Sequence, residues 1–170
     1  SSTSRGLGDV YKRQDKPKNI ILLIGDGMGM NHITLSRMAI GGDNYQLALD
    51  QMPHIGTSTT QSSNDLITDS AAAATTWATG KKTKNKYLSM TPDNEPLQTI
   101  TELLSKRGYL TGVVATSSVT HATPAAFFSH VDSRYKTKEI ASQLLISSID
   151  VAFGGGVKPV SYTHLRAHET

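Results

Sequence analysis

The apolar run Ile-Ile-Leu-Leu-Ile at residues 20–24 constrains the fold of this chain more than any other feature. An unbroken run of this kind, without polar alternation, is typical of a strand that is covered on both faces in a parallel sheet. The run ends at Gly25-Asp26-Gly27, where the glycines permit a sharp turn. Ligands of open α/β sheets bind at the carboxyl ends of the strands, so we expect Asp26 at a binding edge.

Three interpretations of Asp26 are open. The one we favour is a metal ligand, because a hard carboxylate with no lysine or arginine directly beside it suits Mg²⁺ or Zn²⁺. Asp26 could instead be only a turn residue. A dinucleotide-binding loop is the least favoured, because the fingerprint G-x-G-x-x-G needs a glycine where this chain has Met30.

A second segment places a hydroxyl group at the start of a predicted helix. Thr68-Asp69-Ser70 precedes an alanine-rich run, which predicts a helix over residues 71–79 because alanine is the best helix former. The first turn of a helix offers unpaired N–H groups and the positive end of the helix dipole, which suits a phosphate. From this segment alone, a helix cap at Asp69 or Ser70 is favoured over a nucleophile at Ser70, because such caps are common.

A third segment follows a predicted core strand over residues 109–116. His121 and Thr123 are two residues apart, so both could point the same way in an extended approach to the helix that Pro124 is expected to begin. An imidazole and a hydroxyl could form part of a metal shell. A lone histidine in this position would more often be a hydrogen-bonded structural residue.

The order of the predicted elements indicates the fold class. Leu97, Ile100, Leu103 and Leu104 recur at helical spacing and are expected in the core. Strands and helices alternate along the chain, which predicts an α/β sandwich with a mostly parallel sheet. The expected strands are residues 19–24, 54–60, 109–116 and 150–153, and the expected helices are 31–40, 71–79, 97–106, 124–128 and 138–147.

Composition excludes several classes of function. The net charge of +3 over 170 residues gives little support to nucleic-acid or membrane-surface binding. The basic run at residues 81–86 is better explained as a solvated loop than as a phosphate-steering patch. The absence of cysteine excludes disulfides and cysteine metal sites, and no apolar stretch reaches the length of a membrane span.

Asp26, Thr68-Asp69-Ser70, His121-x-Thr123 and Arg134 follow one another in an order that resembles the alkaline phosphatases. The resemblance covers about residues 16–158 and is carried by four segments. They are Asn-Ile-Ile-Leu-Leu-Ile-Gly-Asp-Gly-Met-Gly at 19–29, Thr-Asp-Ser-Ala-Ala at 68–72 with Thr-Gly at 79–80, His-Ala-Thr-Pro-Ala at 121–125 with Ser-Arg at 133–134, and Ala-Phe-Gly-Gly-Gly at 152–156.

The resemblance implies a role for each of these residues. Ser70 would be the nucleophile of phosphate monoester hydrolysis, which would proceed through a phosphoserine. Asp69 would orient Arg134, whose guanidinium would hold the phosphate oxygens. Asp26 would bridge a magnesium site and a zinc site, with the Ser70 oxygen on that zinc. His121 and Thr123 would complete part of the magnesium shell.

The family also implies a three-layer α/β sandwich, Zn²⁺ and Mg²⁺ as cofactors, and a periplasmic or extracellular location. It leaves a homodimer open for the full-length protein. Many bacterial members have aspartate where this chain has His121, and imidazole favours zinc over magnesium, so the metal at that position stays open. The family's remaining zinc ligands lie in later Asp/His motifs that this sequence does not contain, and the 170-residue chain alone is expected to be inactive.

Both ends of the chain depart from the family. Residues 1–14 and 160–170 resemble peptides translated from sequencing-adapter DNA, so we interpret them as a non-native extension and a non-native tail. Residues 15–159 are then the N-terminal part of an alkaline phosphatase-like domain. Two alternatives remain: a superfamily relative that acts on sulfate esters or phosphodiesters, and an inert phosphate- or metal-binding fragment. A sulfatase would need Pro and Arg just after its nucleophile, whereas alanines follow Ser70.

Overall fold

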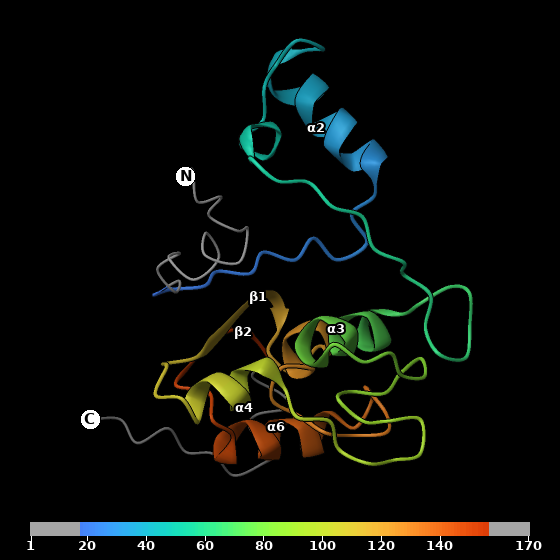
Figure 1. The fold of residues 1–170 in the computed structure, drawn as a ribbon, viewed down its shortest axis with the longest axis vertical. Coiled ribbons are helices and arrows are strands. Elements are labelled where there is room, and N and C mark those ends of the chain that lie inside the picture. Colours follow the sequence, from blue (N-terminus) through green and yellow to red (C-terminus); the bar gives the residue numbers. More distant parts are fainter. Residues whose placement is uncertain (1–17, 157–170) are drawn as a thin grey trace, which may run out of the picture.

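A parallel pair of strands and a set of short helices make up the part of the chain that the computed structural model describes, residues 18–156. Figure 1 shows a main body, which contains both strands and most of the helices, and a projecting segment, residues 30–52, which stands away from it. The elements in chain order are α2 (Met30–Gly41), the 3₁₀ helix η1 (Ala48–Gln51), α3 (Ser70–Thr79), α4 (Ile100–Ser105), β1 (Gly112–Ser118), α5 (Ala122–Ala125), α6 (Thr137–Ile146) and β2 (Val151–Gly155).

The sheet confirms the predicted α/β class. Strands β1 and β2 pair in parallel, with Val113 opposite Ala152 and Val114 opposite Phe153. Parallel neighbours require a crossover connection, and α5 and α6 lie in that connection. Thr111 fixes the start of the pair, because its amide donates to Asp150 Oδ2 at 2.7 Å. Both strands lie within two or three residues of the predicted bounds.

Two predicted strands are wrong. Residues 19–24 and 54–60 are not β-strands in the structure. The side chains of Ile21 and Leu23 are 85% and 84% exposed, and that of Ile55 is 92% exposed. A parallel strand needs hydrogen-bonding neighbours at its edges and cover on its faces. The described residues give neither to these two segments, so an apolar pattern alone does not make them strands.

The helix predictions hold better. Helix α2 covers the predicted residues 31–40, α3 covers 71–79 and α6 lies within a residue of 138–147. Helix α3 ends at Thr79, and its C-cap is Gly80, whose φ of 73° is left-handed and suits glycine. The helix predicted over residues 124–128 is shifted and shorter: α5 begins at Ala122, before Pro124, and ends at Ala125.

Small side chains form the centre of the core. Helices α3 and α5 face one another through alanines, and such small residues let two helix backbones approach closely. Two phenylalanines and several aliphatic side chains pack around them, and Ile140 brings α6 into the same cluster. The buried members are Ala71, Ala74, Ala78, Leu88, Val113, Ala122, Ala125, Ala126, Phe127, Phe128, Val131 and Ile140. This core fixes α3 against α5, and both helices begin at the site described below.

Helix α4 corrects another prediction. Ile100 and Leu103, expected in the core, are 40% and 37% exposed, while Thr99 and Thr101 are buried. Thr99 and Glu102 form a capping box, in which each side chain accepts from the other residue's amide. With only six residues, the helix is placed by these polar contacts rather than by its leucine pattern.

Glu102 also ties α4 to the turn after α5. Its Oε1 lies 2.8 Å from His130 Nε2, and His130 Nδ1 donates to the Ser89 carbonyl at 2.9 Å. Burial raises the pKa of Glu102, but hydrogen bonds from the Thr99 amide and from His130 outweigh burial, so the pKa lies below the ordinary value of a glutamate.

Gly154 of β2 offers a test of strand packing. A Cβ at this position would lie 2.9 Å from Val119 Cγ1 and 3.0 Å from the Ser117 carbonyl oxygen, which is closer than side chains tolerate. We expect Gly154→Ala to lower the free energy of unfolding by about 1–3 kcal/mol, measured by urea denaturation followed by circular dichroism. Gly155→Ala is the matched control, because its Cβ would meet nothing nearer than 3.6 Å. Equal stability of the two variants would contradict the prediction.

Hydrogen bonds within the projecting segment hold its two helices together. Arg37 of α2 donates to Asp50 Oδ1 of η1 at 2.7 Å, and the Leu47 amide donates to the other oxygen of Asp50. Within residues 18–156, no helix combines the length and the apolar character that crossing a membrane requires.

Candidate active site

Asp26 lies at the centre of a hydrogen-bonded group that joins three distant parts of the sequence. Ser70 Oγ donates to Asp26 Oδ1 at 3.0 Å, and Thr123 Oγ1 donates to Asp26 Oδ2 at 3.0 Å. The three residues come from the turn before α2, the start of α3 and the first turn of α5. The structure thus places together the carboxylate and the two hydroxyls that the sequence analysis singled out.

The start of α3 separates the cap from the hydroxyl of Ser70. Asp69 is the N-cap, and its Oδ1 accepts from the Ala72 amide at 3.0 Å. Ser70 is the first helical residue, and its hydroxyl points to Asp26 instead of capping the helix. Of the two caps considered from the sequence, Asp69 is therefore the one that caps α3 in the structure. The Ser70 hydroxyl is not used as a cap.

Arg134 reaches the same site from the loop between α5 and α6. Its Nη1 donates to Asp69 Oδ2 at 3.2 Å, and its side chain is 17% exposed. A guanidinium carries five N–H donors in a fixed plane, and this contact with Asp69 sets the orientation of that plane. Arg134 is thereby held beside the first turn of α3, where an anion would also meet the helix amides.

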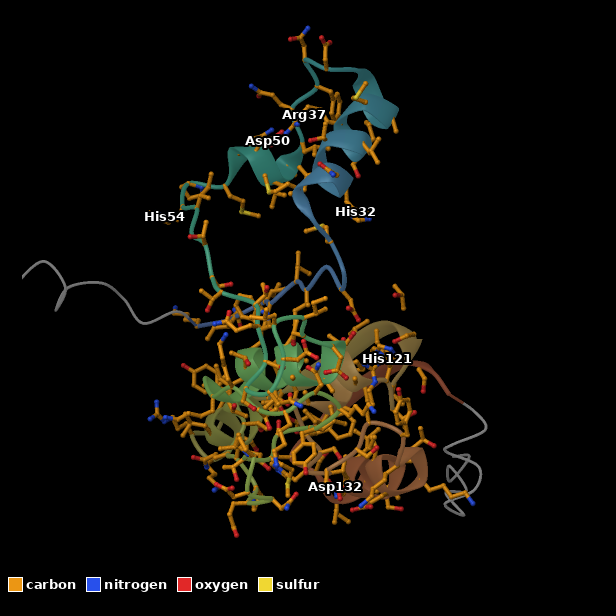
Figure 2. All side chains as sticks on the ribbon, turned by 90° about the vertical axis from the view of Figure 1, so that its right-hand side faces the viewer. His32, Arg37, Asp50, His54, His121 and Asp132 are labelled. Carbon is orange, nitrogen blue, oxygen red and sulfur yellow. The ribbon has the colours of Figure 1, made fainter. Side chains whose placement is uncertain are left out.

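His121 lies in the same network through a contact with Arg134. Its Nε2 lies 3.1 Å from Arg134 Nη2. Because arginine only donates, Nε2 is the acceptor and the ring proton is on Nδ1. Figure 2 shows His121 at the edge of the main body that faces the projecting segment, with Asp132 at the opposite end.

The oxygen atoms of the site match part of the ligand set that a hard cation requires. Asp26, Ser70 and Thr123 present oxygen atoms that converge, which is the ligand type that Mg²⁺ prefers. Among residues 18–156, no group of three or more His, Cys, Asp or Glu side chains is arranged to hold a metal ion. The described residues could therefore supply part of an oxygen-rich metal shell.

The lysines of the basic run anchor loops. Lys82 Nζ donates to the Gln61 carbonyl at 2.6 Å. Lys84 Nζ donates to the Pro92 carbonyl at 2.7 Å and lies 5.6 Å from the centre of the Tyr87 ring. These contacts favour the interpretation of a structural loop for these two lysines over a phosphate-steering patch.

Sequence reasoning missed two neighbours of the site, Asn85 and Lys86. The Asp69 amide donates to Asn85 Oδ1, and the Lys86 amide donates to Asp69 Oδ2. Both residues belong to the basic run at residues 81–86, but that pattern does not reveal their contacts, which are with a residue 16 or 17 positions away.

Comparison with known proteins places this arrangement in a family. The family model described as alkaline phosphatase matches residues 17–169. The chain belongs to the alkaline phosphatase family. The alkaline phosphatase of Schizosaccharomyces pombe is 40% identical to it over 152 residues, which cover 84% of this chain and 28% of that relative.

Solved alkaline phosphatases share the fold. The enzyme from the Antarctic bacterium TAB5 aligns with a TM-score of 0.82 at 38% identity, over 86% of this chain and 42% of that chain. A variant of the TAB5 enzyme, in which a histidine is replaced by aspartate, has Mg bound in its M3 site and aligns with the same TM-score, over 86% of this chain and 41% of that chain. The chain thus spans between 28% and 42% of the length of these relatives.

The predictions for the two ends stay predictions. Residues 1–17 and 157–170, which include the suggested non-native extension and tail, lie outside the described residues. His164 and His168 of the suggested tail fall in the second of these ranges.

Proposed function

We propose that this chain carries the nucleophile and the phosphate-binding arginine of a phosphomonoester hydrolase. The observation that carries the proposal is the position of the Ser70 hydroxyl, 3.0 Å from Asp26 Oδ1 at the first residue of α3. Arg134, bound to Asp69 one residue earlier in the chain, adds a cation beside that hydroxyl. Family membership supports the same reaction class.

In the proposed reaction Ser70 attacks the phosphorus of a phosphate monoester. A bond forms between Oγ and phosphorus while the ester O–P bond breaks and the alcohol leaves. Asp26 accepts the hydrogen bond of the Ser70 hydroxyl and orients it. A serine hydroxyl is a weak nucleophile while it keeps its proton, so it needs activation by a base or by a bound cation. Water then attacks the phosphoserine, which releases inorganic phosphate and restores the hydroxyl.

Arg134 and the start of α3 would bind the transferring group. A guanidinium matches phosphate oxygens with paired donors, and its contact with Asp69 holds it in one orientation before substrate arrives. The amides of the first helical turn add donors and the positive end of the helix dipole. These groups stabilise negative charge that builds up on the phosphoryl oxygens during transfer.

Divalent cations belong to the proposal, with Mg²⁺ and Zn²⁺ as the candidates. Asp26, Ser70 and Thr123 would provide oxygen ligands, and His121 would provide an imidazole after release from Arg134. When bound, such cations lower the pKa of a coordinated hydroxyl and offset charge on the phosphoryl group. We further propose phosphate monoesters as substrates and a periplasmic or extracellular location, both from the family alone.

The 170-residue polypeptide is itself expected to show negligible phosphatase activity. A catalytic zinc normally has three protein ligands, whereas Asp26 and Ser70 are the zinc ligands proposed among the described residues. Binding of phosphate alone would not speed the chemical step. The test is turnover of an aryl phosphate by the purified chain with both metals supplied. Robust turnover that Ser70→Ala abolishes would refute the expectation of inactivity while supporting the assignment of Ser70.

A further inference from the structure

The side chain of Asn85 brackets the residue that precedes Asp69. Its Oδ1 accepts from the Asp69 amide at 3.1 Å, and its Nδ2 donates to the Ile67 carbonyl at 2.9 Å. One planar group thus satisfies an N–H and a C=O on the two sides of Thr68. A carboxamide offers an acceptor and a donor on separate atoms of one plane, which matches these two backbone groups.

Asn85 is itself fixed from the opposite side. The backbone amide of Asn85 donates to Asn64 Oδ1 at 2.9 Å, and that oxygen also accepts from Ser62 Oγ at 3.2 Å. Ser62 is buried, so the hydrogen bonds that lead from Ser62 through Asn64 to Asn85 begin at a buried residue of the main body. The carboxamide therefore has a defined position from which to hold residues 67–69.

The backbone of Lys86, the residue after Asn85, connects Asp69 with Arg134. The Lys86 amide donates to Asp69 Oδ2 at 3.0 Å, and the Lys86 carbonyl accepts from the Arg134 amide at 2.7 Å. Lys86 has a φ of 76°, in the left-handed region that few residues other than glycine adopt. This conformation lets one residue present its N–H to Asp69 and its C=O to Arg134.

We propose that Asn85, together with the Lys86 backbone, is a positioning residue that sets the distance between Ser70 and Arg134. The inference rests on the proposed function, because it concerns how those two groups meet one phosphate. The nucleophile comes from the start of α3 and the arginine from the loop after α5. Asn85 contacts Ile67 and Asp69, and the backbone of Lys86 contacts Asp69 and Arg134. Displacement of the Asn85 carboxamide would therefore move residues 67–69 relative to Arg134.

The test measures binding of inorganic phosphate to the full 170-residue chain by isothermal titration calorimetry. We expect Asn85→Ala to weaken binding by roughly tenfold, equivalent to about 1.4 kcal/mol, while circular dichroism shows the chain still folded. Asn44→Ala is the matched control. Asn44 lies in the projecting segment, and its side-chain Nδ2 donates to Oδ1 of the adjacent Asp43. The loss of the Asn44 side chain is expected to leave the dissociation constant unchanged.

The outcomes separate this inference from the proposed function. If the wild type binds phosphate and Asn85→Ala binds equally well, the positioning role is wrong and the proposed function stands. If the wild type shows no saturable binding, both are wrong. A purely structural role would lower the free energy of unfolding without changing the dissociation constant of the folded chain, and this result also overturns the inference.

A second measurement needs no substitution. In the uniformly labelled wild type, a long-range HNCO spectrum should show a cross-peak between the Asp69 amide nitrogen and the side-chain carbonyl carbon of Asn85.

If Asn85→Ala does not fold, Asn85→Ser replaces it in the phosphate titration, with weakened binding again expected. Failure of both variants to fold would assign Asn85 to the fold and overturn the positioning role.

Discussion

Ser70→Ala is expected to abolish covalent phosphate incorporation and to lower turnover by at least about a thousandfold, since the nucleophile of a covalent mechanism has no substitute. The measurement requires a complete enzyme. A suitable one is a chimera in which the family-matching segment of this chain replaces the matched segment of the TAB5 alkaline phosphatase, which is 38% identical to it. Labelled phosphate trapped at low pH should map to Ser70 in the chimera and disappear in the variant.

Ser142→Ala is the control for that experiment. Ser142 lies on α6, is exposed, and its hydroxyl donates to the Lys138 carbonyl within the same helix. Its loss should leave both turnover and trapped phosphate unchanged. Label on another residue of the Ser70→Ala chimera, with turnover retained, would overturn the assignment of the nucleophile.

Asp69→Ala is expected to lower the free energy of unfolding by about 2–4 kcal/mol. Loss of the N-cap of α3 accounts for about 1 kcal/mol, and the amide of Lys86 and the guanidinium of Arg134 lose their shared acceptor, at about 1–3 kcal/mol in all. Urea denaturation of the 170-residue chain, followed by circular dichroism, measures the change. Asp69→Asn should cost less, because asparagine caps helices as well as aspartate does.

Asp132→Ala provides the comparison for Asp69. Asp132 forms an ion pair with Lys136 at 2.6 Å, but both side chains are 46% exposed. Exposed pairs contribute little to stability, so the free energy of unfolding of Asp132→Ala is expected to stay close to that of the wild type. If Asp69→Ala costs no more than Asp132→Ala, then Asp69 is not the junction between α3, Lys86 and Arg134.

Local chemistry explains which elements the sequence could predict. Helix α3 follows from its alanines and from its C-cap Gly80, and both signals lie within the helix or directly after it. The grouping of Asp26, Ser70 and Thr123 was implied by the resemblance to the alkaline phosphatases, and the structure brings the three side chains into contact. The contacts of Asn85 and Lys86 could not be predicted, because they depend on which loops fold back beside the start of α3.

Strands and buried faces were less predictable because they depend on neighbours. Residues 19–24 have the composition of a buried strand, yet a ladder requires a partner that the described residues do not offer. Ile100 and Leu103 have the spacing of a buried helix face, but buried threonines and the capping box of Thr99 and Glu102 decide which face of α4 turns inward. Both predictions were wrong, because the surroundings of these segments, and not their apolar pattern, determine the outcome.

Asp26 joins chemistry to the assembly of the chain. Its contacts with Ser70 and Thr123 close loops across 44 and 97 residues, and they tie the segment before α2 to α3 and α5. Contacts of such long range are costly in chain entropy and form late in folding. A cation bound by this carboxylate and these hydroxyls would therefore act as a cross-link between the first segment and the main body. Its binding free energy would then also stabilise that closure, so metal affinity and order at residues 18–29 should rise and fall together.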